Sequence, residues 1–371
     1  MQRDELAGWL RLALNPGLGP QAARKLLAAF GLPPSIFAQD DATLAQVVGA
    51  RAGALRKDPA GFDELLDTTL AWLAKDPDRR EVLTLGDAGY PQALLAIEDP
   101  PLMLYRMGLL VDAPQRALAV VGSRNPTPQG LQNARRFSRA FAEAGVSVVS
   151  GLALGIDGAA HEGALEGAGP AAAMATIAVV GTGLDRVYPQ RHLALARRIA
   201  RDGLIVGEYT LGTPPLSANF PRRNRLIAGL ARGTLVVEAA LRSGSLITAR
   251  MAVEAGREVF AIPGSIHSPQ SRGCHALIRQ GAKLVETAAH VLEELRLDAP
   301  VPAAESDPGA PRSGRRDAVL DALGHDPVTL DALAARTGWP PSELSAHLLD
   351  LELSGEVARL PGQLFQRLVR A

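Results

Sequence analysis

Short apolar runs alternate with amphipathic segments through the middle of the chain. Runs rich in Val, Ile, Leu and Ala cover residues 117–121, 146–149, 176–180, 204–206, 235–237 and 259–262. Apolar side chains at helical spacing separate most of these runs, over residues 129–144, 156–166, 193–201, 225–231 and 246–255. Because short continuous apolar strands that alternate with helices are buried on both faces, the pattern predicts a doubly wound, mostly parallel α/β sheet. Ligands of such sheets bind at the carboxyl ends of the strands, so the turns there are the candidate site.

The segment before this sheet is predicted to be a small helical domain of the SAM or helix-hairpin-helix type. Leu6, Leu10 and Leu14 recur at helical spacing, and a second helix follows over residues 22–30. The turn between them, residues 15–20, contains two glycines, which permit a close approach of the backbone. Such a turn can offer N–H groups to a DNA phosphate, and a plain helical hairpin is an equally good interpretation. Residues 76–114, rich in Pro and Asp, are predicted to be a connector.

The end of the chain is predicted to be a winged helix behind a flexible linker. Residues 297–314 contain four prolines and almost no large side chain, which is typical of a linker. Two helices and a hairpin follow, over residues 328–336, 341–353 and 356–367. The second helix carries Glu343, Asp350 and Glu352 without Arg or Lys, so it would repel phosphate. We therefore favour a protein-contact or structural role for this domain over reading of DNA.

These patterns divide the chain into four expected parts with different charges. The parts are a helical domain (1–80), a sheet domain (81–295), a linker (296–314) and a winged-helix domain (315–371). The chain has zero formal net charge, but residues 1–115 carry −4, residues 116–286 carry +9 and residues 287–371 carry −5. A basic middle between acidic flanks suggests that the middle domain meets a polyanion, and a chance excess of solvated arginines is the alternative.

Composition excludes several classes of protein. The N-terminus does not resemble a signal peptide and no apolar run is long enough to cross a bilayer, so we expect a cytoplasmic protein without membrane association. Cys274 is the only cysteine, which rules out an intrachain disulfide or a cysteine-based zinc finger. A phosphate-binding loop of the Walker A type is also absent from the sequence.

Glycine-rich turns follow the first three predicted strands. The first, Gly122-Ser123-Arg124, lacks the further glycines of a dinucleotide fingerprint, and Arg124 instead suits a phosphate clamp. The second begins at Gly151 and leads to Asp157 and His161, and a third is residues 181–183. Asp157 and His161 are four residues apart and could ligate a metal, but a helix cap and a packed histidine are the preferred interpretation. We expect neither a metal nor a cofactor.

The densest candidate motif combines an aromatic ring with arginines and amides. The motif is predicted to be a loop bounded by prolines, and its candidate binding residues are Asn219, Phe220, Arg222, Arg223, Asn224 and Arg225. An exposed ring can stack on a base while arginines bind phosphates, which is typical of proteins that bind single-stranded nucleic acid. A core phenylalanine between surface arginines is the alternative. A further anion-binding turn, with Ser243, Gly244 and Ser245, opens the helix after the fifth strand.

Five of these motifs in order resemble the DNA-processing protein A (DprA/Smf) family. They lie at residues 122–124, 150–161, 181–189, 220–225 and 242–249, and the resemblance covers residues 81–286. It implies an extended Rossmann-like fold, a homodimer, binding of incoming single-stranded DNA during natural transformation, and loading of the RecA recombinase onto that DNA. Two departures stand out: Leu154 occupies a position that is often basic, and residues 167–175 look like a surface insertion.

Other functions are weighed against this one. The fold class also resembles lysine-decarboxylase-like phosphoribohydrolases, which use a Pro-Gly-Gly-x-Gly-Thr signature. The comparable turn here, residues 240–245, lacks that glycine run, and no convincing catalytic set lies among the turns, so we expect a binding protein rather than an enzyme. A transcriptional regulator that uses the winged helix is disfavoured by the acidity of that domain.

Overall fold

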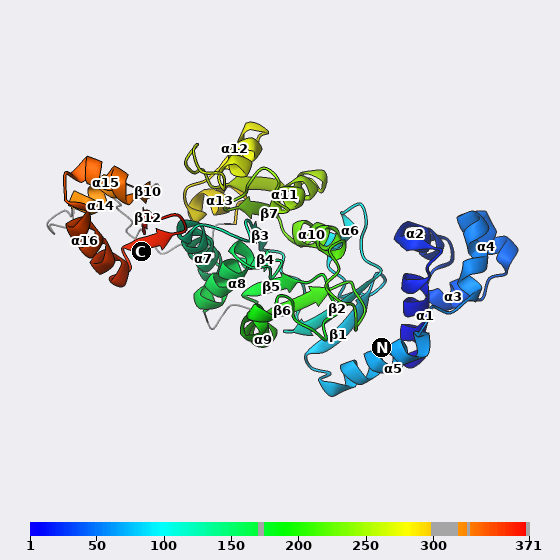
Figure 1. Ribbon diagram of the computed structural model, residues 1–371. Helices are drawn as coiled ribbons and strands as arrows, with labels where there is room; N and C mark the ends of the chain where they lie inside the picture. The colour runs from blue at the N-terminus through cyan, green and yellow to red at the C-terminus, as the bar shows by residue number, and fades with distance from the viewer. Residues whose placement is uncertain (170–173, 298–317, 325–326, 369–371) are drawn as a thin grey trace.

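A nine-stranded sheet forms the centre of the computed structural model, which describes residues 1–169, 174–297, 318–324 and 327–368. The strand order is β1-β2-β6-β5-β4-β3-β7-β8-β9, and all strands from β6 to β9 in this order pair in parallel. The strands are β1 Arg80–Thr84, β2 Met103–Gly108, β3 Ala117–Val121, β4 Ser147–Ser150, β5 Thr176–Val179, β6 Leu204–Gly207, β7 Gly233–Val236, β8 Glu258–Ala261 and β9 Lys283–Leu284. The mostly parallel α/β class predicted from the sequence is confirmed (Figure 1).

Helices cover both faces of this sheet (Figure 1). They are α6 Gln92–Leu95, α7 Pro128–Glu143, α8 Ile156–Gly167, η2 Gln190–His192, α9 Leu193–Asp202, α10 Asn219–Leu230, α11 Ser245–Glu254, α12 Arg272–Arg279 and α13 Ala288–Glu294. In β3, Leu118 and Val120 pack with α7 and α8, whereas Ala119 and Val121 pack with α10 and α11. Successive side chains of a strand point to opposite faces, so an entirely apolar strand is buried on both sides.

Residues 76–114 differ from the predicted connector. They contain β1, the short helix α6 and β2, and both strands are antiparallel additions to the edge of the sheet. Arg106 interrupts the apolar run of β2, and its Nη1 lies 3.0 Å from Oε2 of Glu81, its cross-strand neighbour. The prediction was wrong because these two charged residues interrupt the apolar runs by which buried strands are recognised in a sequence.

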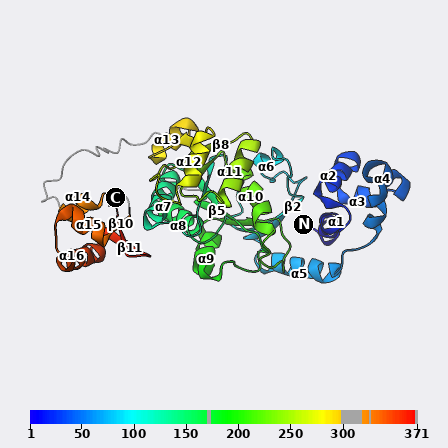
Figure 2. The ribbon, with the colours of Figure 1, turned by 45° about the horizontal axis from the view of Figure 1, so that its top comes forward.

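The N-terminal helices pack on this antiparallel edge. They are α1 Arg3–Leu14, α2 Gly19–Phe30, α3 Pro33–Phe37, α4 Asp41–Val48, η1 Gly49–Arg56 and α5 Phe62–Lys75. Their core continues into the sheet, where Trp72 of α5 meets Tyr105 of β2 edge-to-face with ring centroids 6.1 Å apart. Figures 1 and 2 both show these helices beyond β1 and β2. The helical character predicted for this segment is confirmed.

The winged helix has its own small core. It comprises α14 Ala318–Leu323, β10 Val328–Thr329, α15 Leu330–Thr337, α16 Pro341–Leu353, β11 Val357–Leu360 and β12 Leu364–Arg367. Leu333, Leu344 and Leu348 are fully buried there. Both the helices and the hairpin lie where the sequence predicts them. Two predicted segments lie largely outside the described residues. They are the linker, of which residues 298–314 are not described, and the insertion, of which residues 170–173 are not described. No described helix is long and apolar enough to cross a membrane.

Candidate nucleic-acid interface

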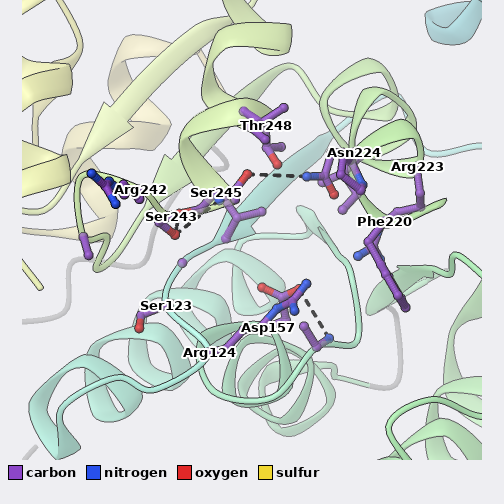
Figure 3. Close-up of a pocket in the computed structure, with 18 of the residues that line it drawn as sticks. Ser123, Arg124, Asp157, Phe220, Arg223, Asn224, Arg242, Ser243, Ser245 and Thr248 are labelled. Carbon is purple, nitrogen blue, oxygen red and sulfur yellow. Dashed lines mark hydrogen bonds between the residues drawn. The ribbon is translucent and has the colours of Figure 1, made fainter. Parts of the chain in front are cut away.

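The chain reverses direction across the sheet beside β3. From β3 it moves outward through β4, β5 and β6, and it then returns to place β7 on the other side of β3. Such a switch point leaves a crevice outside the carboxyl ends of the two strands. The turns after β3, β4 and β7 meet there, as Figure 3 shows.

An open cavity of about 710 Å³ occupies this crevice. The predicted residues that line it are Gly122, Ser123, Arg124, Phe220, Arg223, Asn224, Ser243, Gly244 and Ser245. Gly122 allows three segments of the chain to approach closely. A Cβ at this position would lie 2.7 Å from the Ile156 side chain and 2.9 Å from the Glu238 carbonyl oxygen. The fold therefore brings together predicted residues that are up to 123 positions apart in the sequence.

A half-buried aromatic ring lies beside an exposed arginine in this cavity. The Cζ atom of Arg124 is 5.8 Å from the centroid of the Phe220 ring, and the Tyr188 ring is 5.5 Å from it. A guanidinium at this distance from a ring face is a cation–π contact. Phe220 is thus neither a fully exposed loop residue nor a core residue, and it presents part of its surface to the cavity.

The segment from Asn219 to Arg225 is the beginning of a helix and not the predicted loop. Helix α10 starts at Asn219, and Pro221 lies in its first turn, where a missing N–H costs no hydrogen bond. Asn219 is buried and donates from Nδ2 to the Gly181 carbonyl oxygen at 3.1 Å. The helical periodicity separates the arginines of this segment onto different sides of α10.

Arg223 faces the protein interior, where it supports the floor of the cavity. It is 3% exposed, and Nη1 donates to the carbonyl oxygens of Gly151 at 2.6 Å and of Val179. These two carbonyls belong to the ends of β4 and β5. Burial lowers the pKa of Arg223 to about 10, so the side chain still carries its charge at neutral pH. The structure places Arg223 as a positioning residue that adds positive potential, rather than as the phosphate ligand we expected.

Asp157 balances part of this buried charge. Its Oδ2 accepts hydrogen bonds from the backbone N–H groups of Gly151 at 3.1 Å and Ala153 at 3.4 Å. Burial raises the pKa of Asp157, and the charge of Arg223 opposes that shift. Asp157 thus accepts from the N–H of Gly151 while Arg223 donates to its carbonyl oxygen, and the two side chains together hold the turn after β4.

His161 takes no part in the cavity. It is fully buried, and its Nδ1 lies 2.7 Å from the Thr176 hydroxyl, which itself donates to the Val148 carbonyl oxygen. Nδ1 therefore carries the proton, and burial lowers the pKa of the ring to about 3. His161 and Asp157 bond to separate protein groups, and no cluster of three potential metal ligands occurs in the described part of the chain.

The wall opposite Arg124 is the N-terminus of α11. The hydroxyls of Ser243 and Ser245 are 2.7 Å apart, and Asn224 Nδ2 approaches the Gly244 carbonyl oxygen at 3.5 Å (Figure 3). Hydroxyls and backbone N–H groups at a helix N-terminus form a favourable environment for an anion. Arg242 is exposed and lines the same wall.

Arg222 and Arg225 do not line this cavity. Arg225 is largely buried, and its Nη2 donates to Glu208 Oε2 at 2.5 Å while Nε lies 3.5 Å from Asp99 Oδ2. Arg222 is exposed and borders a neighbouring cavity. Both residues are two and five positions after Phe220 in α10, so their side chains point away from the Phe220 side of the helix. They therefore do not lie beside Phe220, where the sequence analysis expected them to bind phosphate.

Among the lining residues that the sequence analysis did not predict, three contribute polar or aromatic groups to the argument. Tyr188 contributes the second aromatic ring, Arg242 a second exposed guanidinium, and Gln270 a hydrogen bond from Nε2 to the Asn125 carbonyl oxygen at 3.0 Å. Tyr188 and Arg242 belong to motifs that were recognised, and their position next to glycine-rich turns was the available signal. Gln270 lies in a loop without any such signal.

Comparison with known proteins agrees with this geometry. A family model described as DNA recombination-mediator protein A matches residues 81–296. The chain belongs to the DprA/Smf family. A second model, the DprA winged helix domain, matches residues 302–363. The resemblance inferred from the five sequence motifs is confirmed.

Several DprA/Smf relatives are similar over most of the chain. Protein Smf of Escherichia coli (strain K12) is 42% identical over 313 residues, which cover 82% of each chain. DNA processing protein DprA of Streptococcus pneumoniae is 46% identical over 60% of this chain and 77% of its own length. Its X-ray structure matches with a TM-score of 0.63 and 39% identity over 79% of this chain and 98% of that chain.

A DprA structure from Helicobacter pylori, described for its single-stranded DNA binding mode, also matches. Its TM-score is 0.52 at 32% identity, over 58% of this chain and 96% of that chain. The part of the present chain that it covers is smaller than in the pneumococcal match.

Proposed function

We propose that this DprA/Smf protein binds single-stranded DNA in the cavity at the ends of β3, β4 and β7. The observation that carries the proposal is the Phe220 ring, which is half-buried at the cavity wall with the Arg124 guanidinium beside it. An aromatic face stacks on an unpaired base of any sequence, and a neighbouring arginine binds the phosphate next to it. Bases of a duplex are already stacked on each other, so this arrangement favours a single strand.

The charges around the cavity support the same ligand. Arg124 and Arg242 are exposed on opposite walls, and the buried Arg223 lies below them. Asp157 is the acidic residue among the lining side chains, and it bonds to backbone N–H groups of the turn after β4. The positive potential is therefore directed to the open side, where a phosphate backbone can lie.

We further propose that the bound strand is incoming DNA in natural transformation and that the protein loads RecA onto it as a homodimer. The description of the matching family as a recombination mediator supports a recombinase partner. A role without catalysis fits the lining serines, since Ser243 and Ser245 bond to each other and no described His lines the cavity. The protein would then act by holding and presenting the strand.

Titration of labelled oligonucleotides tests the binding proposal. The protein should bind a single strand more tightly than a duplex of the same sequence, and Phe220→Ala should weaken only the single-strand binding. Arg232→Ala is the matched control, because Arg232 is exposed directly before β7, at the opposite edge of the sheet. Equal affinity for both forms would contradict the proposal, and release of free base from nucleoside monophosphates would favour the hydrolase alternative.

A further inference from the structure

A second cavity, of about 330 Å³, lies between α10 and the N-terminal helices. It is bordered on one side by Tyr209, Arg222 and Arg225, and on the other by Ala13, Leu14 and Pro20, which flank the turn between α1 and α2. This is the glycine-containing turn that the sequence suggested as a possible phosphate-binding element. The fold thus brings that turn and the exposed Arg222 to one cavity, although they are about 200 positions apart.

The arginines of this second cavity have unused donors. Arg222 is exposed and makes no hydrogen bond or ion pair with any described residue. Arg225 is held by Glu208 and Asp99 through Nη2 and Nε, but its buried Nη1 has no hydrogen-bond partner among the described residues. Nη1 is closed off from the cavity, so Arg225 contributes charge to the wall, whereas the exposed Arg222 offers free donors to a ligand.

Acidic groups near this cavity are already matched. Asp99 pairs with both Arg225 and Arg24 of α2, and Glu208 pairs with Arg225. Burial raises the pKa of Glu208, while the charge of Arg225 opposes that shift. Three arginines (Arg24, Arg222 and Arg225) thus face two carboxylates, so the group has a net positive charge, and Arg222 is the arginine that is left without an ion pair among the described residues.

Helix α10 separates the two cavities. Phe220 borders the first cavity and Arg222 borders the second. Residues two positions apart point to nearly opposite sides of a helix. Tyr209 links them, because it lines the second cavity while its hydroxyl donates to the Asn219 carbonyl oxygen at 3.3 Å. A strand would have to cross only the first turn of α10, about 10 Å wide, to reach from one cavity to the other.

We infer that the second cavity is a subsite for the phosphate backbone of nucleotides that continue beyond the base stacked on Phe220. This inference rests on the proposed binding of single-stranded DNA, and it adds the N-terminal turn and Arg222 to the path of the strand. Arg222 binds a phosphate oxygen there, Arg225 adds positive charge to the same wall, and Pro20 and Leu14 form the opposite wall. Short strands end before this subsite, and longer strands enter it.

Oligothymidylates of two lengths, about six and about fifteen nucleotides, test the subsite in the full-length protein. Arg222→Ala should reduce the salt slope of log K for the long strand by about 0.7, the value of one phosphate contact. Binding of the short strand should stay unchanged. Equal effects of Arg222→Ala on both lengths, or none on the long strand, would overturn the subsite.

Substitutions in the N-terminal helices provide an independent arm. Pro20→Glu should weaken binding of the long strand and Pro20→Arg should tighten it, since Pro20 borders the cavity in the first turn of α2. Ala28→Glu is the matched control, because it adds the same charge at an exposed position later in α2. Equal weakening by both Glu variants would contradict a local subsite.

The same experiment distinguishes failure of the subsite from failure of the proposed function. If the short strand binds and loses affinity on Phe220→Ala, the first cavity is the DNA site whatever Arg222 does. If neither strand responds to Phe220→Ala, both the proposed function and the subsite fail together.

Discussion

At the residue scale, Phe220 combines stacking potential with partial packing. Its ring touches Tyr188 and lies 3.2 Å from the place where a Cβ of Gly181 would be. Phe220→Ala should cost about 1–3 kcal/mol of single-strand binding, because one stacked base is lost. The free energy of unfolding should fall by clearly less than the about 3–5 kcal/mol of a fully buried phenylalanine, since the ring is only half-buried.

Phe220→Tyr is the control for this prediction. The aromatic face is retained and the added hydroxyl can point into the open cavity, so most of the affinity should remain. Thermal melting and strand titration of both variants give the two quantities separately. A large loss of stability with unchanged affinity of the folded protein would show that Phe220 only packs.

His161 gives a second prediction at this scale, on pH. Its pKa is about 3 in the folded protein and near 6.5 in an unfolded chain, so the unfolded state binds more protons between these values. The histidine's contribution to stability is therefore complete above pH 6.5 and declines as the pH falls. His161→Asn, which can keep the hydrogen bond to Thr176, should remove up to about 1.4 kcal/mol per pH unit from the slope between pH 6.5 and 5. Denaturant titrations at both pH values measure it, and parallel slopes for the two proteins would contradict it.

At the scale of elements, the turn after β4 depends on the contact between Gly151 and Arg223. A Cβ at Gly151 would lie 2.4 Å from Nη1 of Arg223, so Gly151→Ala must displace the guanidinium. We expect a loss of about 1–3 kcal/mol of stability together with weaker strand binding. Gly244→Ala is the matched control for stability, because no atom lies within 4 Å of its Cβ position and its φ is −62°. Equal melting temperatures for Gly151→Ala and the wild type would refute the positioning role of Arg223.

The elements that the sequence predicted well are those with a simple apolar pattern. β3 and α11 are close to their predicted bounds because buried parallel strands and amphipathic helices differ clearly in periodicity. The start of α10 was misplaced, because Pro221 and three arginines in the segment suggested a loop. Burial of Arg223 could not be predicted, since its partners are carbonyl groups at the ends of β4 and β5, which are 72 and 44 residues away in the sequence.

At the scale of the whole molecule, charge is distributed between domains. The middle of the chain is basic, and the winged helix presents Glu343, Asp350 and Glu352 on α16. Removal of residues 297–371 should therefore leave single-strand affinity nearly unchanged, because an acidic helix contributes little to phosphate binding. Titration of the truncated protein with the same oligonucleotide checks this. A large loss of affinity would instead indicate that the winged helix reads DNA.

The salt dependence of single-strand binding tests the central claim most directly. Arg124 and Arg242 are the two exposed arginines that line the first cavity on opposite walls. The double variant Arg124→Ala/Arg242→Ala should reduce the slope of log K against log salt by about 1.4, because each phosphate contact on a single strand contributes about 0.7. Arg232→Ala, at the far edge of the sheet, should leave the slope unchanged. An unaltered slope in the double variant, or an equal reduction in the control, would contradict a single-stranded DNA site at the ends of β3, β4 and β7.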